Sequence, residues 1–252
     1  MSYGLYISAG GATAQSKQLE VIANNLANVD TVGFKRDLAV CQAQYAEGIE
    51  EGIDTPWTGG LADQGGGTLL QQTATDFSEG HLKQTGRKLD MAIQGEGFFQ
   101  VQKDGEIFLT RAGNFDLSPE GQLITAQGYP VLNNEGSPIQ IDPSEGEWTI
   151  TPKGVIDQVG GSPRPIGLVM PESLGNLTKV GENLFRCSSN PTPVENDNRR
   201  IANHYLEQSS VVAATSMVDM ITTSRFFQAN TRMMQTQDEM TGNLIGRVLR
   251  VK

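Results

Sequence analysis

Residues 20–36 read Glu20-Val21-Ile22-Ala23-Asn24-Asn25-Leu26-Ala27-Asn28-Val29-Asp30-Thr31-Val32-Gly33-Phe34-Lys35-Arg36. Apolar residues recur here at steps of three, four and three, at Leu19, Ile22, Leu26 and Val29. This spacing places them on one narrow stripe of an α-helix, and steps of seven extend the stripe backwards to Leu5 and Ala12. A stripe this narrow is typical of a coiled-coil seam rather than of a helix that covers a globular core. The sequence therefore predicts an N-terminal helix, over residues 1–32, that needs a partner helix.

The predicted helix ends at Gly33, because glycine readily adopts the left-handed conformation that commonly follows a helix. Three asparagines, Asn24, Asn25 and Asn28, precede this end, where their helix propensity is poor. Two interpretations of them remain open. They cap and solvate the helix end, or Asn25 hydrogen-bonds a partner and fixes the register of the seam, as a polar seam residue can.

A second helical pattern follows Ser209 and Ser210 and predicts a C-terminal helix over residues 209–252. Positions seven apart form one row: Met220, Phe227, Met234, Thr241 and Val248. Met217 and Ile245 belong to a second row, whose other positions, Ser224, Thr231 and Asp238, are polar. Methionine side chains adapt to irregular neighbours, so this helix suits a variable packing surface.

One narrow stripe does not offset the entropy of ordering a long helix. We therefore expect the two terminal helices to pair as a coiled coil, and to be disordered or weakly helical in a free monomer. The predicted assembly interface comprises Leu5, Ala12, Leu19, Ile22, Asn25, Leu26, Val29, Met217, Met220, Phe227, Met234, Ile245 and Val248.

Between the helices, residues 33–80 lack clear periodicity, and glycines interrupt them repeatedly. This pattern predicts an irregular connector. From residue 81 to 208 the pattern becomes one of short strands separated by turn signals. For example, residues 98–102 and 106–111 flank Lys103-Asp104-Gly105, a hairpin signal because Asp-Gly fits the positive φ angles of a tight turn. Further strands are predicted at 89–94, 122–125, 130–132, 139–141, 147–151, 154–159, 166–170 and 183–187. The sequence thus predicts an α+β protein in which the paired helices flank a central all-β domain.

Charge is unevenly distributed along the 252 residues, whose net charge is −10. Residues 1–36 carry +1 and residues 225–252 carry +3, so residues 37–224 carry −14. An acidic middle disfavours nucleic acid as a partner and suits a solvated body. No apolar run is long enough to span a membrane, and the N-terminus lacks the features of a cleaved secretory signal.

The sequence contains no recognisable catalytic motif. The two histidines, His81 and His204, belong to no metal or nucleophile motif and are expected on the surface or in turns. Gly95-Glu96-Gly97 lacks the third glycine of a dinucleotide-binding fingerprint. Cys41 and Cys187 have no spacing typical of a disulfide scaffold or a zinc site and are predicted to be free thiols. We therefore expect no catalytic site, cofactor or metal.

Three motifs, in order along the chain, resemble those of the flagellar basal-body rod and hook proteins. Residues 23–29 with Gly33-Phe34-Lys35 are similar to the N-terminal signature of that group. Residues 89–99, 110–115 and 121–123 are similar to its β-domain signature, and residues 216–240 to its C-terminal helix. Within the family, residues 232–239 and the opening Gly4-Leu5-Tyr6 resemble the FlgF-type proximal-rod proteins more than the FlgG-type distal-rod proteins.

The resemblance implies a structural subunit of the basal-body rod in the periplasm. It implies export through the flagellar type III apparatus, and helical polymerisation with copies of itself and with other rod proteins. The terminal helices would form an inner layer around the export channel, and the packed shaft would transmit torque. Two alternatives remain beside the FlgF-type assignment: the FlgG-type distal-rod protein, and a secreted β-rich binding module with helical arms.

Overall fold

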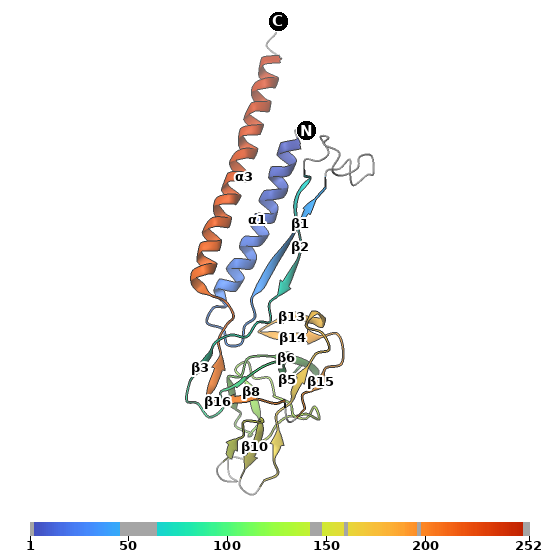
Figure 1. Ribbon diagram of the computed structural model, residues 1–252, viewed down its shortest axis with the longest axis vertical. Coiled ribbons are helices and arrows are strands. Elements are labelled where there is room, and N and C mark those ends of the chain that lie inside the picture. The colour runs from blue at the N-terminus through green and yellow to red at the C-terminus, as the bar shows by residue number, and fades with distance from the viewer. Residues whose placement is uncertain (1–2, 46–64, 142–147, 159–160, 196–197, 249–252) are drawn as a thin grey trace. The chain divides into compact units, whose positions relative to one another are not determined.

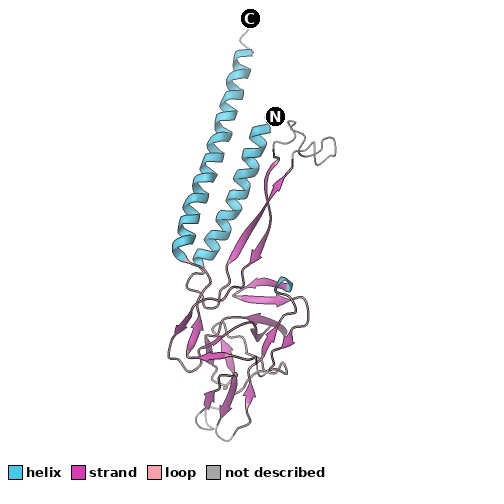
Figure 2. Ribbon diagram, viewed as in Figure 1, coloured by secondary structure: helices cyan, strands magenta, loops and turns pink. Residues whose placement is uncertain are grey.

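The computed structural model describes residues 3–45, 65–141, 148–158, 161–195 and 198–248 (Figure 1). The chain forms two compact units. The first, here the helical unit, contains Met1–Ala27, Asp37–Asp76 and Val212–Lys252. The second, here the β unit, contains Asn28–Arg36 and Phe77–Val211. Helices at both ends of the chain and a central region of several sheets make this an α+β protein, as predicted (Figure 2).

The helical unit consists of α1 (Tyr3–Ala27), α3 (Ala213–Val248) and a hairpin of β1 (Asp37–Gln44) and β2 (Gly67–Thr75). Helix α1 packs against α3 on one side and against the hairpin on another (Figure 1). The predicted pairing of the terminal helices is therefore confirmed within a single subunit.

Helix α1 ends five residues earlier than predicted, at Ala27 rather than residue 32. Turns follow instead, in which the Thr31 amide donates to the Asn28 carbonyl (3.2 Å) and the Thr31 hydroxyl to Asn28 Oδ1 (3.1 Å). Asparagine side chains compete with helical hydrogen bonds in this way, which explains the early stop. Gly33 does adopt the left-handed conformation, with φ +66°.

The prediction of an irregular connector over 33–80 was wrong for the residues of β1 and β2. These strands pair from Asp37↔Thr75 to Gln44↔Gly67, with a shift in register between Val40 and Cys41. Several of their side chains are small or polar, and many on both faces are exposed, so the alternation that marks a half-buried strand is weak. The glycine-rich residues 46–64, on which the connector prediction largely depended, lie outside the described residues.

The β unit is built from antiparallel strand pairs. Its elements are β3 (Leu82–Gln84), β4 (Met91–Ile93), β5 (Phe98–Lys103), β6 (Glu106–Thr110), β7 (Phe115–Leu117), β8 (Leu123–Thr125), β9 (Trp148–Ile150), β10 (Val155–Gln158), β11 (Arg164–Pro165), β12 (Leu168–Met170), η2 (Leu174–Asn176), β13 (Leu177–Gly181), β14 (Leu184–Cys187), β15 (Thr192–Pro193), β16 (Ile201–Asn203) and β17 (Tyr205–Glu207). The largest sheet has the order β13-β14-β6-β5-β12-β15. A three-stranded sheet has the order β11-β10-β9, and β16-β4, β17-β3 and β7-β8 form separate pairs.

Most predicted strands are present within a few residues of their expected ends. The predicted hairpin at Lys103-Asp104-Gly105 is confirmed, since Lys103 pairs with Glu106 and both turn residues have positive φ (52° and 84°). Residues 130–132 and 139–141 form isolated bridges and loop hydrogen bonds rather than full strands. Within the described residues of the β unit, seven strands were not predicted: β3, β7, β11, β13, β15, β16 and β17.

Apolar side chains from most of these strands meet in one main core. Its members include Met91, Phe99, Phe115, Leu123 and Val131, all at 0% exposure. Phe99 and Phe115 stack edge to face with ring centroids 5.1 Å apart. A smaller cluster of Phe98, Leu109, Val169, Leu177 and Phe185 packs with Phe77. The β unit thus has its own core and meets the usual condition for independent folding.

Candidate assembly interface

Helices α1 and α3 run antiparallel, because the start of α1 lies beside the far part of α3. A Cβ added at Gly4 would lie 2.7 Å from Nε2 of Gln237, and one added at Gly11 would lie 3.0 Å from Nδ2 of Asn230. Later residues of α1 are thus next to earlier residues of α3. Helix α3 extends past the start of α1, so its last turns have no α1 beside them (Figure 1).

Most residues of the predicted seam are at least partly buried in α1 and α3. Ala12 is 6% exposed, and Leu5, Leu19, Ile22 and Leu26 are half-buried. On α3, Met220, Phe227 and Met234 are half-buried, as expected of one row. Val29 follows α1 and belongs to the β unit, and the side chain of Val248 lies outside the described residues. A role of these residues in contacts between subunits stays a prediction.

Beside the row of Met220, the less exposed positions of α3 lie one residue before the second predicted row. Met217 and Ile245 are 52% and 54% exposed, so the described part of the subunit leaves about half of each side chain open to solvent. The less exposed row is instead Ser216, Thr223, Asn230 and Gln237, with Thr223 at 4% exposure. A helix brings both i+3 and i+4 to the same side, so either Ser216 or Met217 can follow the row of Met220, and a role of Met217 and Ile245 in contacts between subunits stays a prediction. Gly4 and Gly11 of α1 face Gln237 and Asn230, and these small residues could have indicated that the polar row packs against α1.

Asn25 is hydrogen-bonded within the subunit, and its role in contacts between subunits stays a prediction. It is 8% exposed, its Nδ2 donates to the Asp37 carbonyl (2.7 Å), and its Oδ1 accepts from the Asp37 amide (2.8 Å). Asp37 Oδ1 in turn accepts from the Thr75 hydroxyl (2.8 Å) on β2. Asn25 therefore fixes the hairpin to the last turn of α1, which neither open interpretation had included.

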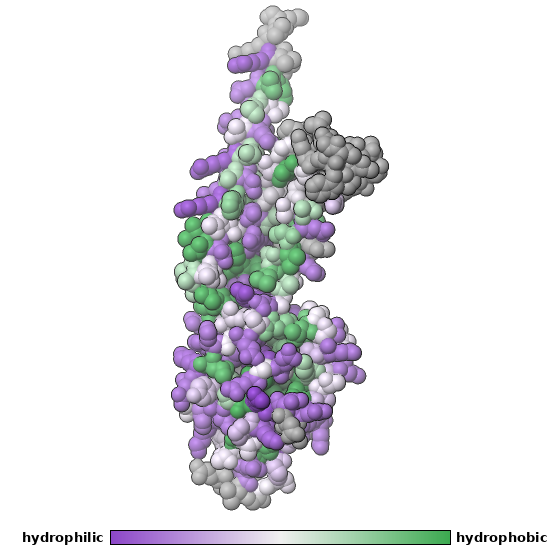
Figure 3. All heavy atoms as spheres, viewed as in Figure 1, coloured by the Kyte–Doolittle hydropathy of each residue, from purple (hydrophilic) through white to green (hydrophobic). Residues whose placement is uncertain are grey.

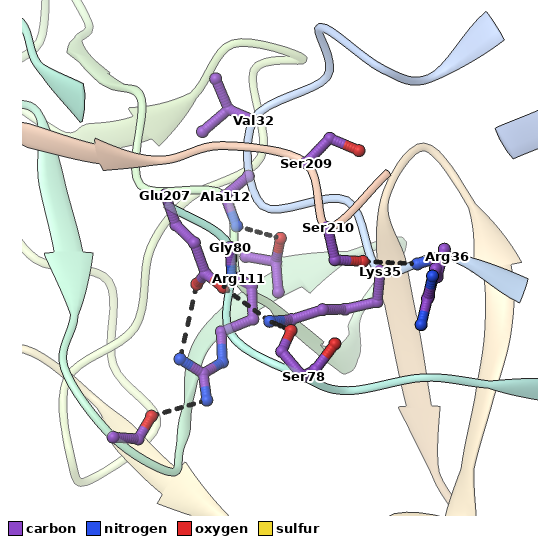
Figure 4. Close-up of polar contacts among 12 residues, drawn as sticks. Val32, Lys35, Arg36, Ser78, Gly80, Arg111, Ala112, Glu207, Ser209 and Ser210 are labelled. Carbon is purple, nitrogen blue, oxygen red and sulfur yellow. Dashed lines mark hydrogen bonds and ion pairs between the residues drawn. The ribbon is translucent and has the colours of Figure 1, made fainter. Parts of the chain in front are cut away.

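Lys35, the last residue of the N-terminal signature, lies in a buried ion cluster of the β unit (Figure 4). Lys35 is 1% exposed, and its Nζ donates to Glu207 Oε1 (2.6 Å) and to the Ser78 carbonyl (2.8 Å). Arg111 Nη1 lies 3.5 Å from Glu207 Oε2. Burial lowers the pKa of Lys35, and the neighbouring Glu207 carboxylate opposes that shift. These contacts join segments from both ends of the β unit's sequence.

Backbone contacts support the same cluster. The Gly33 amide donates to the Glu207 carbonyl (2.7 Å), and the Ser210 amide donates to the Phe34 carbonyl (3.0 Å). The Arg36 amide donates to the Ser210 hydroxyl (2.9 Å). The cluster is therefore structural: it holds the incoming segment of residues 33–36 beside the outgoing segment of residues 207–210.

Helix α3 also presents an apolar row that stays largely exposed beside the described residues of the subunit. Phe226, Met233 and Met240 follow one another at steps of seven and are 62%, 56% and 57% exposed. We call these three residues the outer row. Small exposed residues, Ala229 and Thr236, lie between them on the same side. Green side chains are visible along the helical unit in the space-filling view (Figure 3).

Sites of other kinds do not emerge from the described parts of the chain. They contain no group of three or more residues that could hold a metal ion, and no helix long and apolar enough to cross a membrane. His81 and His204 are exposed, and His204 occupies a turn with φ +65°. Cys41 and Cys187 are free thiols, the first exposed and the second half-buried.

Three family profiles match the chain. Residues 5–35 match the flagella basal body rod protein, residues 92–158 the flagellar hook protein FlgE/F/G D1 domain, and residues 202–247 the flagellar basal body rod FlgEFG protein C-terminal region. The flagellar basal-body rod protein FlgG of Buchnera aphidicola (from Schizaphis graminum) is 37% identical over 258 positions, covering 95% of this chain and 97% of the relative. The chain belongs to the flagellar basal-body rod protein family. FlgF of Caulobacter vibrioides is 33% identical over 251 positions, with 98% of each chain covered.

Family membership makes this rod protein a structural subunit of the flagellar basal-body rod, and not an enzyme. The matched N-terminal region ends at residue 35 and the matched C-terminal region starts at residue 202. Both regions thus include a partner of the Lys35–Glu207 ion pair.

Proposed function

We propose that this rod protein polymerises through its terminal helices, with the outer row of α3 as a contact surface. The observation that carries the proposal is the row itself: three large apolar side chains, more than half exposed, at the spacing of a coiled-coil seam. Because α3 already packs against α1 through another side, this second seam implies that a further helix packs on the outer row. In a rod, that helix comes from a neighbouring subunit, and repeated contacts of this kind give a stiff shaft around an export channel.

An aspartate or glutamate in the outer row tests this proposal. Met233→Glu changes an exposed residue, so the subunit should keep its fold, but the variant should be lost from isolated basal bodies. Gln228→Glu is the matched control, because Gln228 is also exposed but lies on another side of α3. Normal incorporation of the Met233→Glu variant would contradict the role of the row.

We further propose that the protein is a FlgF-type proximal-rod subunit, exported through the flagellar type III apparatus. Residues 232–239 and the opening Gly4-Leu5-Tyr6 support this type. The alignment with FlgF of Caulobacter vibrioides spans 251 positions at 98% of each chain, so hardly any insertion separates the two. Identity with FlgG of Buchnera aphidicola is higher, at 37%, and favours the distal type.

Deletion of the gene in the source bacterium separates the two types. A proximal subunit is needed before the distal rod is built, so its loss should leave basal bodies that lack every distal-rod protein. Loss of a distal subunit would instead leave the proximal rod intact. Mass spectrometry of purified basal bodies, with complementation by this chain as the control, gives the answer.

A further inference from the structure

Methionines are concentrated in helix α3. Five of the eight methionines of the chain belong to it: Met217, Met220, Met233, Met234 and Met240. Met233 and Met240 are two of the three members of the outer row. We propose that Met233 and Met240 are sites of reversible oxidation to methionine sulfoxide, and that this modification keeps a free subunit out of the rod. This inference rests on the proposed function of the outer row and adds a chemical control of it.

Exposure separates these two thioethers from the methionine of the core. Met233 and Met240 are 56% and 57% exposed, whereas Met91 is 0% exposed within the β unit. Oxidation of a methionine requires that the oxidant reach its sulfur, so it follows exposure. Met217 is 52% exposed and should react as well, but 16 residues separate it from Met233, which places it on nearly the opposite side of α3. The modification thus alters the outer row through Met233 and Met240.

The oxidant class is a peroxide, represented by hydrogen peroxide. A lone pair of the thioether sulfur attacks one peroxide oxygen, the O–O bond breaks, and an S–O bond forms. The departing hydroxide takes the proton of the transferred hydroxyl group and leaves as water. The sulfur loses two electrons and the peroxide gains them. Methionine sulfoxide reductases, with a thiol as the reductant, return the side chain to the thioether, so the modification is reversible.

The sulfoxide changes the outer row more than it changes the fold of the subunit. It converts a flexible apolar side chain into a polar one, whose oxygen accepts hydrogen bonds from water in the free subunit. Packing on an apolar seam removes that water without supplying a donor, which is unfavourable. Both side chains are already more than half exposed, so α3 keeps its packing on α1. The expected defect is therefore in assembly.

Assembly in turn protects the two methionines. In the proposed rod the outer row is covered by a neighbouring subunit, so an oxidant no longer reaches either sulfur. Oxidation before incorporation excludes the subunit, whereas a subunit that is already incorporated resists it. The oxidation state of the free subunit is thus the controlling state.

Peptide mass spectrometry tests the sites. Purified chain and isolated basal bodies are treated with hydrogen peroxide, and the added oxygen is measured at each methionine over time. In the free chain, Met233 and Met240 should oxidise roughly tenfold faster than Met91, and in basal bodies they should slow by a similar factor, since susceptibility follows exposure. Treatment of the oxidised chain with sulfoxide reductases and dithiothreitol should remove the added oxygen. Equal rates at Met91 and Met233 in the free chain would overturn the site assignment.

Substitution by leucine tests the consequence. A variant with Met233→Leu and Met240→Leu removes both sulfur atoms and keeps large apolar side chains in the outer row. A pulse of hydrogen peroxide during synthesis should lower the amount of unaltered chain in basal bodies by roughly tenfold, because two polar groups must be buried. The double variant should be incorporated normally under the same pulse. Met170→Leu is the matched control: Met170 is exposed (38%) in the β unit, so this variant should remain sensitive to peroxide.

The outcomes separate this inference from the proposed function. Normal incorporation of chain that carries both sulfoxides would overturn the inference, and so would equal peroxide sensitivity of the double leucine variant and the unaltered chain. In either case the contact role of the outer row would stand if Met233→Glu still prevents incorporation. Equal oxidation of Met233 in basal bodies and in the free chain would show that the row stays exposed in the rod, and would overturn both. If the double variant is not incorporated without peroxide, the single leucine variants decide, since each should lessen the loss caused by the pulse.

Discussion

Gly33 occupies a backbone position that any residue with a side chain would strain. Its φ is +66°, and an added Cβ would lie 2.5 Å from the carbonyl carbon of Arg111. A side chain here would thus collide with backbone, which cannot rotate away as a long side chain can. The glycine of the N-terminal signature is therefore explained less by the end of α1, which stops at Ala27, than by its fit within the β unit.

Gly33→Ala should therefore destabilise the β unit by roughly 2–5 kcal/mol, from left-handed strain and the steric clash combined. Urea unfolding followed by near-ultraviolet circular dichroism measures the loss. Gly86→Ala is the matched control: its φ is +78°, but an added Cβ has no atom within 4 Å. That variant should lose only about 1 kcal/mol. Equal losses in both variants would show that the clash with Arg111 does not matter.

Lys35 supports a second prediction, because it is buried while its charge is paired. Lys35→Met would leave the Glu207 carboxylate with only the longer Arg111 contact, 3.5 Å, and its backbone donor from Gly80 (3.0 Å). Removing one partner of a buried pair destabilises a protein by roughly 3–5 kcal/mol. Lys103→Met breaks the more exposed Lys103–Glu182 pair and should change the free energy of unfolding far less, because solvent screens that pair. The same urea titration compares them, and similar effects would contradict a special role of burial.

The sequence alone does not indicate that Lys35, Arg111 and Glu207 lie side by side in the fold. Lys35 and Arg111 occur in the motifs that resemble the rod family, but Glu207 is 172 residues from Lys35 and was assigned no role. A charged residue that becomes fully buried looks in the sequence like any solvated one. Only the pairing of β17 with β3 and the return of residues 33–36 create the site.

Among the elements, the strength of the local pattern decided what could be predicted. Strands β5, β6, β8 and β10 combine apolar residues with Gly-containing turns, and their positions were predicted to within a few residues, whereas seven strands of the β unit were not predicted. Helix α1 was predicted because its stripe is regular, but its end was not, since Asn28 and Thr31 form a turn that no periodicity indicates. The β1–β2 hairpin gave no signal, because its packing against α1 and its anchor at Asn25 are tertiary contacts.

Leu26 tests the helix pairing at the scale of the element. It is half-buried on α1, and Leu26→Asp should weaken the pairing with α3 by roughly 2–4 kcal/mol, since it removes apolar contact and buries a charge. We expect reduced helical circular dichroism, an unchanged near-ultraviolet spectrum of the β unit, and loss of incorporation into the rod. Ala23→Asp places the same charge at an exposed position of the same helix and controls for helix propensity. Normal motility of the Leu26→Asp strain would refute the seam.

At the scale of the whole molecule, the two units differ in how much apolar surface they bury. Nearly all fully buried large hydrophobic residues belong to the β unit, whereas the buried apolar residues described in the helical unit are Ala12 and Ala14. Helix α3 keeps eight large apolar side chains exposed, among them Met217, Phe226 and Leu244. The helical unit of an isolated subunit is thus expected to be the less stable part, and contacts with neighbours supply the burial it lacks.

Limited proteolysis of the purified monomer and of isolated basal bodies measures this difference. In the monomer, residues 3–27 and 213–248 should be cleaved well before residues 81–205, because segments with few buried apolar contacts open at lower free energy. In assembled rods the same helices should be protected, since the proposed packing on a neighbour buries the outer row. Native-state hydrogen exchange provides an independent measure for each helix. Helices as resistant as the β unit in the monomer would contradict the coupling of their order to assembly, and would leave the exposed row of α3 without the stabilising role assigned to it.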